Sequence, residues 1–348
     1  MRIAQVAPLY EPVPPVLYGG TERIVSFLTE ELVRRGHHVT LFASGDSSTS
    51  ARLVPVTKHA ARVEASNRDQ LHAAHVRQLG MVFGNAHAFD VIHCHVDFLA
   101  FPFSRLVRTP VVHTVHGRLD LPYLEPVFRE FRDVPMVSIS DAQRAPVAAL
   151  RPRWAGTVYH GLPLGLFPFQ RHPGRYLAFL GRIAPEKRPD VAIEVALRAG
   201  LPLRIAAKVD PIDREFFEAR VKPLLDHPLV EFVGEIDNRQ KARFLGDAIA
   251  LLFPIDWPEP FGLVMIEAMA CGTPVIASRC GSVPEVVVPG RTGFIADSVE
   301  ELVAAVARVH TIDRAECRRH VERRFAVAHM ADGYEAVYER LCAPARAA

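Results

Sequence analysis

The chain has 348 residues, which predicts two domains at ~150 residues per domain. Hydrophobic residues make up 49% of the chain and charged residues 23%, a composition that supports large cores and excludes a disordered, collagenous or disulfide-scaffold protein. The 41 Lys and Arg against 39 Asp and Glu leave a net charge of +2, which favours no nucleic-acid partner. The five cysteines are odd in number and lack C-x-x-C spacing, which fits a reducing cytoplasm.

The first residues predict a β-strand and no secretory signal, because Pro8 interrupts the short apolar stretch and only one basic residue precedes it. No window approaches the ~18 uninterrupted apolar residues of a membrane span. We therefore expect a cytoplasmic protein. A basic stretch from Arg52 to Arg77 could meet an anionic acceptor or a lipid headgroup, or could be a solvated helix face. A peripheral membrane contact thus stays open, and the sequence does not indicate an oligomeric state.

Short apolar runs alternate with helical periodicity along the first half of the chain, which is the pattern of βαβ units and a parallel sheet. Strand Ile3–Ala7 comes before helix Thr21–Arg35, which Gly36 ends. The further strands predicted in this half are Val39–Ala43, Val91–His95, Val111–His116, Met136–Ser140 and Thr157–Tyr159.

The pattern restarts after His160–Gly174, a segment punctuated by Pro and Gly like an inter-domain linker. We expect an α/β protein with two Rossmann-like domains, 1–165 and 166–329, that face each other across a cleft. The strands predicted in the second half are Tyr176–Leu180, Leu203–Ala207, Val230–Val233, Ala250–Phe253, Pro274–Ala277 and Phe294–Ile295. The helices that close the chain are predicted at about Val299–His310, Asp313–Arg324 and Ala331–Leu341.

The common nucleotide-binding loops are absent, since no G-x-x-x-x-G-K-[ST] occurs and no G-x-G-x-x-G follows the first strand. In their place, Gly19-Gly20 comes directly before the first helix. Paired glycines at a helix N-terminus let backbone amides approach an anion closely. The alternative is a flexible turn in which Thr21 caps the helix.

A second loop with anion-binding character, Gly181–Lys187, comes just after a predicted strand. That edge of an open α/β sheet is where such folds bind ligands. Arg182 and Lys187 on one loop can neutralise a diphosphate and stabilise it as a leaving group without a metal ion. The alternative is a solvated basic loop without function.

Glu259 and Glu267 are separated by seven residues, the first in a loop and the second within the helix that follows. The six steps from Phe261 to Glu267 span ~9 Å of helix, so one carboxylate could reach a sugar and the other a ribose. A diphosphate would then lie near the helix N-terminus. The alternative for Glu267 is a buried salt bridge, because an unpaired buried carboxylate is costly.

His93-Cys94-His95 invites comparison with a zinc site. Side chains alternate on a strand, so the two histidines share a face while Cys94 points to the other. We therefore expect no metal here and interpret the segment as a strand end at the cleft. His113 and His116 are expected at the neighbouring strand edge, which would give a cleft floor lined with histidines.

These loops, taken together with further motifs in the same order, resemble a retaining family 4 glycosyltransferase of the GT-B fold. The resemblance covers essentially the whole chain. The further motifs are Thr114-Val115-His116-Gly117, Ser140 with Arg144, Gly161, Phe232-Val233-Gly234, and Cys271-Gly272-Thr273-Pro274-Val275-Ile276-Ala277.

The resemblance implies a role for each matching residue. Arg182 and Lys187 would hold the donor diphosphate, Glu267 the ribose hydroxyls and Glu259 the hydroxyls of the transferred sugar. His116 would face that sugar near its 6-hydroxyl. The remaining residues expected to bind the donor are Gly19, Gly20, Gly181, Val233, Phe261, Gly262 and Leu263. One departure is His160-Gly161, where such enzymes more commonly have Asn-Gly.

The resemblance also assigns the domains and the reaction. The first domain would bind the acceptor, the second the nucleotide sugar, and a C-terminal helix at about 330–348 would pack back on the first. The partners would be an NDP-sugar such as a UDP- or GDP-hexose, as co-substrate, and an acceptor that the sequence does not identify. No cofactor or metal is expected.

Two other functions stay open at the level of sequence. One is a non-hydrolysing NDP-sugar epimerase of the same fold, against which the pair of glutamates counts. The other is a catalytically silent NDP-sugar-binding protein, which would be expected to lose His116 or Glu259, and both are present.

Overall fold

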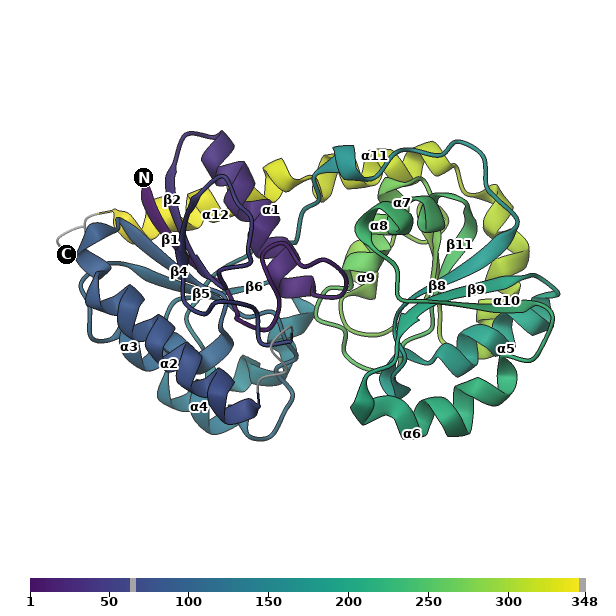
Figure 1. Cartoon of the computed structure of the whole chain (residues 1–348). Coiled ribbons are helices and arrows are strands. Elements are labelled where there is room, and N and C mark those ends of the chain that lie inside the picture. Colours follow the sequence, from purple (N-terminus) through teal and green to yellow (C-terminus); the bar gives the residue numbers. More distant parts are fainter. Residues whose placement is uncertain (63–66, 344–348) are drawn as a thin grey trace. The chain divides into compact units, whose positions relative to one another are not determined.

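The computed structural model describes residues 1–62 and 67–343. It divides the chain into two compact units, unit 1 with Met1–Gly161 and Val327–Ala348, and unit 2 with Leu162–Ala326 (Figure 1). Each unit contains one sheet in which all the neighbouring strands pair in parallel. The α/β class and the two parallel sheets predicted from the sequence are therefore confirmed.

The sheet of unit 1 has the strand order β3-β2-β1-β4-β5-β6-β7. Its strands are β1 (Arg2–Val6), β2 (His38–Ala43), β3 (Arg52–Pro55), β4 (Val91–Cys94), β5 (Val111–Thr114), β6 (Met136–Ser138) and β7 (Trp154–Thr157). The edge strand β3 is missing from the sequence-based elements because its short run is only half-buried and carries no clear alternation. At the other edge, β7 begins at Trp154, so the strand predicted at Thr157–Tyr159 was placed too late.

Helices cover both faces of this sheet. They are α1 (Gly20–Arg34), α2 (Arg68–Gly84), α3 (Phe101–Ser104), α4 (Leu124–Glu130) and α12 (Val327–Cys342), with a 3-10 helix at Ala142–Leu150. Ala4 and Cys94 belong to the core cluster that α2 completes with Leu79. Gln5 and His93 point to the opposite face, where both bind Tyr338 of α12. The alternation predicted for the strand that contains His93 is thereby confirmed.

The last helix, α12, belongs to unit 1 although unit 2 separates it from the rest of that unit in the sequence. Tyr334, Val337 and Tyr338 are its buried face. Arg35, which follows α1, binds Asp332 at 2.7 Å and also binds Glu335, so ion pairs connect the two helices. The helix begins earlier than the predicted Ala331, and residues 344–348 of the segment expected to be helical lie outside the described residues.

The sheet of unit 2 has the order β10-β9-β8-β11-β12-β13, and all six strands predicted in this half are present. The strands are β8 (Tyr176–Arg182), β9 (Leu203–Lys208), β10 (Val230–Gly234), β11 (Ala248–Phe253), β12 (Val275–Ser278) and β13 (Gly293–Ala296). The helices are α5 (Pro189–Ala199), α6 (Arg214–Phe216), α7 (Asn238–Gly246), α8 (Leu263–Ala270), α9 (Val283–Val286), α10 (Val299–Arg308) and α11 (Arg314–Arg324).

In both sheets, the order of the strands reverses at the strand that comes first in the sequence, β1 in unit 1 and β8 in unit 2. In unit 1, β1 lies between β2 and β4, and in unit 2, β8 lies between β9 and β11. The connections that leave the carboxyl ends of β1 and β4, or of β8 and β11, therefore run to opposite sides and leave a crevice between them. Side chains on these loops are placed to meet a ligand.

We expect the buried face of α12 to contribute strongly to the stability of unit 1. Tyr334 is fully buried, so Tyr334→Ala should lower the free energy of unfolding by ~3–5 kcal/mol. Glu339→Ala on the exposed face of the same helix should change it by no more than ~0.5 kcal/mol. Denaturant unfolding of both variants measures the difference, and equal effects would contradict this packing role.

Candidate active site

The loops that follow β8 and β11 meet at the crevice of unit 2. Arg182 is the last residue of β8, and Lys187 ends the 3-10 turn Pro185–Lys187 that comes next. The carbonyl of Glu186 accepts a hydrogen bond of 2.9 Å from the backbone of Asp256, which holds the two loops together. The cationic side chains predicted for a diphosphate are thus presented at the carboxyl edge of the sheet.

Lys187 and Glu259, two of the residues singled out in the sequence, form an ion pair across these loops. The Lys187 ammonium also lies over the ring of Trp257, 4.4 Å from its centroid. The indole Nε1 of Trp257 donates to the same carboxylate oxygen, Oε2 of Glu259, at 3.0 Å. Glu259 is only 8% exposed, so its charge is stabilised by these two donors.

Arg182 is held by two carboxylates. Its Nη1 lies 3.0 Å from Oδ2 of Asp213, and its Nη2 donates to Glu186. Burial raises the pKa of Asp213, and the guanidinium of Arg182 opposes that rise. No sequence motif marks Asp213, and its contact with Arg182 was not predicted.

The loop that contains Glu259 is anchored by its own backbone. The carbonyl of Glu259 accepts from the backbone of Ser282 at 2.9 Å, and the hydroxyl of Ser282 donates to the carbonyl of Phe261 at 2.8 Å. Gly262 caps α8 with φ of 77°, a left-handed conformation that favours glycine. Since α8 begins at Leu263, its length up to Glu267 is ~6 Å and not the ~9 Å counted from Phe261.

Glu267 is 3% exposed and forms a salt bridge of 2.5 Å between its Oε1 and Nζ of Lys241 on α7. This is the buried ion pair that the sequence left open as an alternative to a binding role. Lys241 itself was not predicted, because no sequence motif marks it. The two remaining donor candidates of unit 2 lie in the sheet, Gly181 in β8 and Val233 in β10.

In unit 1, the glycine pair begins α1. Gly19 is the N-cap with φ of 148°, and a Cβ at this position would lie 2.8 Å from Cβ of Pro15, so glycine is required there. Gly20 and Thr21 are already in the first turn, and no side chain caps the helix. The alternative in which Thr21 is the cap is therefore wrong.

An acidic residue that the sequence did not single out follows this glycine pair. Glu22 is 4% exposed in the first turn of α1, and burial raises its pKa to about 7. The nearby Glu11 adds to this rise, while Arg62, which binds Glu11 at 2.7 Å, opposes it. Near neutral pH the carboxyl is thus partly protonated, which weakens its repulsion of an anion at the helix N-terminus.

His116 follows β5, and contacts from two directions fix its place. Its backbone N–H donates to the carboxylate of Asp97, a residue in the left-handed conformation with φ of 48°. Its ring Nε2 lies 2.9 Å from Nδ1 of His95, and the ring stacks on His160 with centroids 5.3 Å apart. Burial lowers the pKa of His116 to about 3, so the ring is neutral.

The expectation that His113 lines the same surface is wrong. His113 on β5 pairs in register with Cys94 and points to the other face of the sheet. There its Nε2 binds the Ser104 hydroxyl at 2.7 Å and its ring packs edge-on against Phe101. The register of β4 and β5 thus separates His113 from His116, three residues further along the chain.

Across residues 1–62 and 67–343, no group of three or more His, Cys, Asp or Glu side chains is arranged to hold a metal ion. In the same part of the chain, no helix is both long and apolar enough to cross a membrane.

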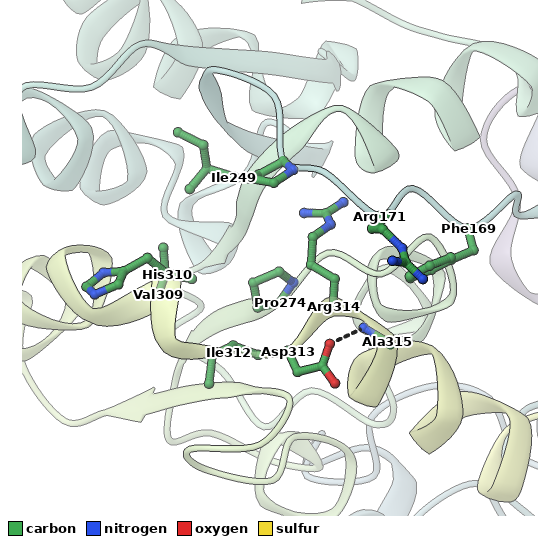
Figure 2. A pocket seen from close by; sticks show the side chains of 11 residues that line it. Phe169, Arg171, Ile249, Pro274, Val309, His310, Ile312, Asp313, Arg314 and Ala315 are labelled. Atoms are coloured by element: carbon green, nitrogen blue, oxygen red, sulfur yellow. Dashed lines mark hydrogen bonds between the residues drawn. The ribbon is translucent and has the colours of Figure 1, made fainter.

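A cavity of about 510 Å³ lies at the opposite edge of the unit 2 sheet, where β11 begins and β12 is about to begin (Figure 2). Ile249 of β11 and Pro274, which comes just before β12, line it. The guanidinium of Arg314 is bonded to the carbonyls of Gln170, Gly246 and Ala248. Because this edge carries none of the residues expected to bind the donor, the cavity is separate from the candidate site.

Comparison with known proteins agrees with the fold. The Glycosyl transferases group 1 family matches residues 169–324, and Glycosyltransferase Family 4 matches residues 18–140. A glycogen synthase of Mycobacterium tuberculosis is 28% identical over 92% of this chain and 88% of its own length.

Among solved structures, a sucrose-phosphate synthase from Thermosynechococcus elongatus has a TM-score of 0.78, with 23% identity and 98% coverage of both chains. An Anabaena protein in complex with UDP and glucose has a TM-score of 0.73, with 16% identity over 96% of this chain and 98% of its own.

Two Rossmann-like units with these matches define a glycosyltransferase of the GT-B fold. More specifically, the chain belongs to glycosyltransferase family 4, the group 1 glycosyl transferases.

The buried histidines of unit 1 should make the protein sensitive to acid. Burial lowers the pKa values of His93, His95, His113, His116 and His160, so each binds a proton more readily in the unfolded chain. The raised pKa values of Glu22 and Asp97, about 7 and about 6, act in the opposite direction. Below pH ~6.5 the net effect should lower the free energy of unfolding by as much as ~4 kcal/mol per pH unit.

Denaturant unfolding between pH ~7.5 and ~5.5 measures this dependence. His113→Gln should reduce its slope by ~1.4 kcal/mol per pH unit, because one of the histidines that titrate on unfolding is removed. His72→Gln should leave the slope unchanged, since that ring is exposed in both states. A slope that is the same in all three proteins would contradict the assignment to buried histidines.

Proposed function

We propose that this glycosyltransferase transfers a hexosyl unit from an NDP-sugar to an acceptor with retention of anomeric configuration. The observation that carries the proposal is the group of charges at the crevice of unit 2. There Arg182 ends β8, and Lys187 and Glu259 lie on the loops that follow the neighbouring strands β8 and β11. The binding of UDP and glucose by the Anabaena protein of the same fold supports a nucleotide-sugar donor.

The two cations can serve a diphosphate without losing their present partners. An ammonium has three N–H groups and a guanidinium five, so Lys187 and Arg182 can each keep a carboxylate and still donate to phosphate oxygens. Their ion pairs hold these donors in place before a ligand arrives, which favours stabilisation of charge that develops on the leaving group. The backbone amides of Phe261, Gly262 and Leu263 would add donors at the start of α8.

The two glutamates each have one oxygen left for a ligand. Within the described part of the chain, Glu259 accepts side-chain hydrogen bonds through Oε2 and not through Oε1. Glu267 accepts one through Oε1 and not through Oε2. The other oxygen of Glu259 would accept from hydroxyls of the transferred sugar, and that of Glu267 from the ribose. His116 and the Gly19-Gly20 amides of unit 1 would contact the sugar and the phosphates.

In the reaction, the acceptor oxygen would form its bond to the anomeric carbon on the face from which the diphosphate leaves. The bond from that carbon to the diphosphate oxygen would break, and the proton of the acceptor hydroxyl would pass to the leaving diphosphate. Arg182 and Lys187 would stabilise the negative charge that grows there. No metal ion and no covalent intermediate is required by this scheme.

The glutamates provide the test of the donor orientation. Glu267→Gln should weaken binding of both NDP and NDP-sugar, whereas Glu259→Gln should spare NDP and weaken only NDP-sugar. A lost charged hydrogen bond costs ~1.5–3 kcal/mol, or roughly ten- to a hundredfold in affinity, which calorimetry can measure. Glu194→Gln on the exposed face of α5 is the control and should change neither affinity. Equal losses for NDP and NDP-sugar in both site variants would exclude the orientation.

Slow hydrolysis of the NDP-sugar, in which water replaces the acceptor, tests the reaction itself. The released hexose should first appear with the anomeric configuration that it had in the donor, as followed by proton NMR. The rate should be unchanged by EDTA, because two cationic side chains stabilise the diphosphate. Inverted sugar would exclude retention, activity that EDTA abolishes and Mg²⁺ restores would exclude metal independence, and an isomerised NDP-sugar would favour an epimerase.

A further inference from the structure

A chain of buried polar side chains in unit 1 leads from α12 to His116. It passes from Tyr338 on α12 to Gln5 on β1, then to His95 at the end of β4 and finally to His116 after β5. Gln5 and Tyr338 are 0% exposed and His95 is 1% exposed. The direction of each hydrogen bond is therefore set by the neighbours within the chain and not by water.

The amide of Gln5 sets the direction. Its Nε2 donates to the Tyr338 hydroxyl at 3.2 Å, which leaves its carbonyl Oε1 facing Nε2 of His95 at 2.8 Å. A carbonyl oxygen can only accept a hydrogen bond, so the Nε2 of His95 must carry a proton.

The tautomer of His95 determines that of His116. Burial holds the pKa of His95 well below its usual value, so the ring is neutral and its single proton on Nε2 leaves Nδ1 bare. That bare nitrogen lies 2.9 Å from Nε2 of His116, which must then be the donor. His116 is also neutral, so its own Nδ1 carries a lone pair and no proton.

We infer that Gln5 and His95 are positioning residues that fix His116 in one orientation and one tautomer, with Nδ1 as a hydrogen-bond acceptor. Nδ1 of His116 is buried, and nothing in the described residues donates to it. A buried acceptor without a partner is uncommon and calls for an explanation such as a ligand. A hydroxyl of the transferred sugar is the donor that fits, and this assignment rests on the proposed function.

The surroundings of His116 suit this role. His116 as a residue is only partly buried, so a small displacement would give a ligand hydroxyl access to the buried Nδ1. Asp97 fixes the backbone of His116, and stacking on His160 fixes the plane of the ring. With Nε2 occupied by His95, Nδ1 is the only polar atom of the ring that can meet a sugar.

The tautomer can be read directly by NMR of protein labelled with ¹⁵N-histidine, without any ligand. Long-range ¹⁵N–¹H correlations, assigned with His116→Asn, should show His116 with a protonated Nε2 and an unprotonated Nδ1. A proton on Nδ1 would mean that the Gln5 amide is reversed and would overturn the inference.

Gln5→Met should release this constraint, because the thioether of methionine is only a weak acceptor for the N–H of His95. His116 should then show a mixture of tautomers, and the affinity for NDP-sugar should fall about two- to tenfold while that for NDP is unchanged. Gln5→Glu keeps an acceptor for His95 and should preserve the tautomer of His116, which provides a second variant if Gln5→Met folds poorly.

Gln78→Met is the matched control. Gln78 is also 0% exposed in unit 1, but its Nε2 donates to the backbone carbonyls of Ala7 and Phe42, and among the described residues no hydrogen bond joins it to a histidine. The Gln78→Met variant should have lower stability but an unchanged His116 spectrum and an unchanged affinity for NDP-sugar. Equal spectra for Gln5→Met and the parent protein would overturn the positioning role. A changed tautomer with unchanged NDP-sugar affinity would instead leave positioning intact and exclude the sugar contact of the proposed function.

Discussion

The arrangement of the functional side chains depends on one constraint. The first strand of each unit, β1 or β8, pairs with a neighbouring strand on each of its two sides. Because β1 and β8 are central, the connections on their two sides diverge, and the carboxyl ends of the strands stay uncovered. The loops that follow β8 and β11 place Lys187 against Glu259. The ends of β1, β4 and β5 place Gly19, His95 and His116 at the corresponding edge of unit 1.

The two units stabilise their buried polar side chains in different ways. In unit 2, cations and carboxylates are paired, as in Lys241 with Glu267, so that charge near the crevice is balanced before a ligand arrives. In unit 1, neutral histidines and tyrosines form hydrogen bonds between β1, β4 and α12. Paired charges can be shared with an anionic ligand, whereas the neutral network holds rings and tautomers fixed.

The sequence was sufficient for features that depend on local pattern. Alternation along β4 correctly separated His93 and His95 from Cys94, and apolar runs correctly located the strands of unit 2. Features that depend on partners distant in the chain were not predictable. Lys241 meets Glu267 only because α7 packs on α8, and His93 meets Tyr338 across 245 residues. Neither pairing leaves a periodicity or a motif that a single sequence can show.

The placement of α12 has a consequence for the order in which the chain can acquire its structure during synthesis. Unit 2 is one continuous segment and contains all of its own strands, so it can fold as soon as Ala326 has left the ribosome. Unit 1 begins first but must wait, because Gln5 and His93 lack their partner until Tyr338 has been made. The half of the protein that is translated first is therefore the half that is completed last.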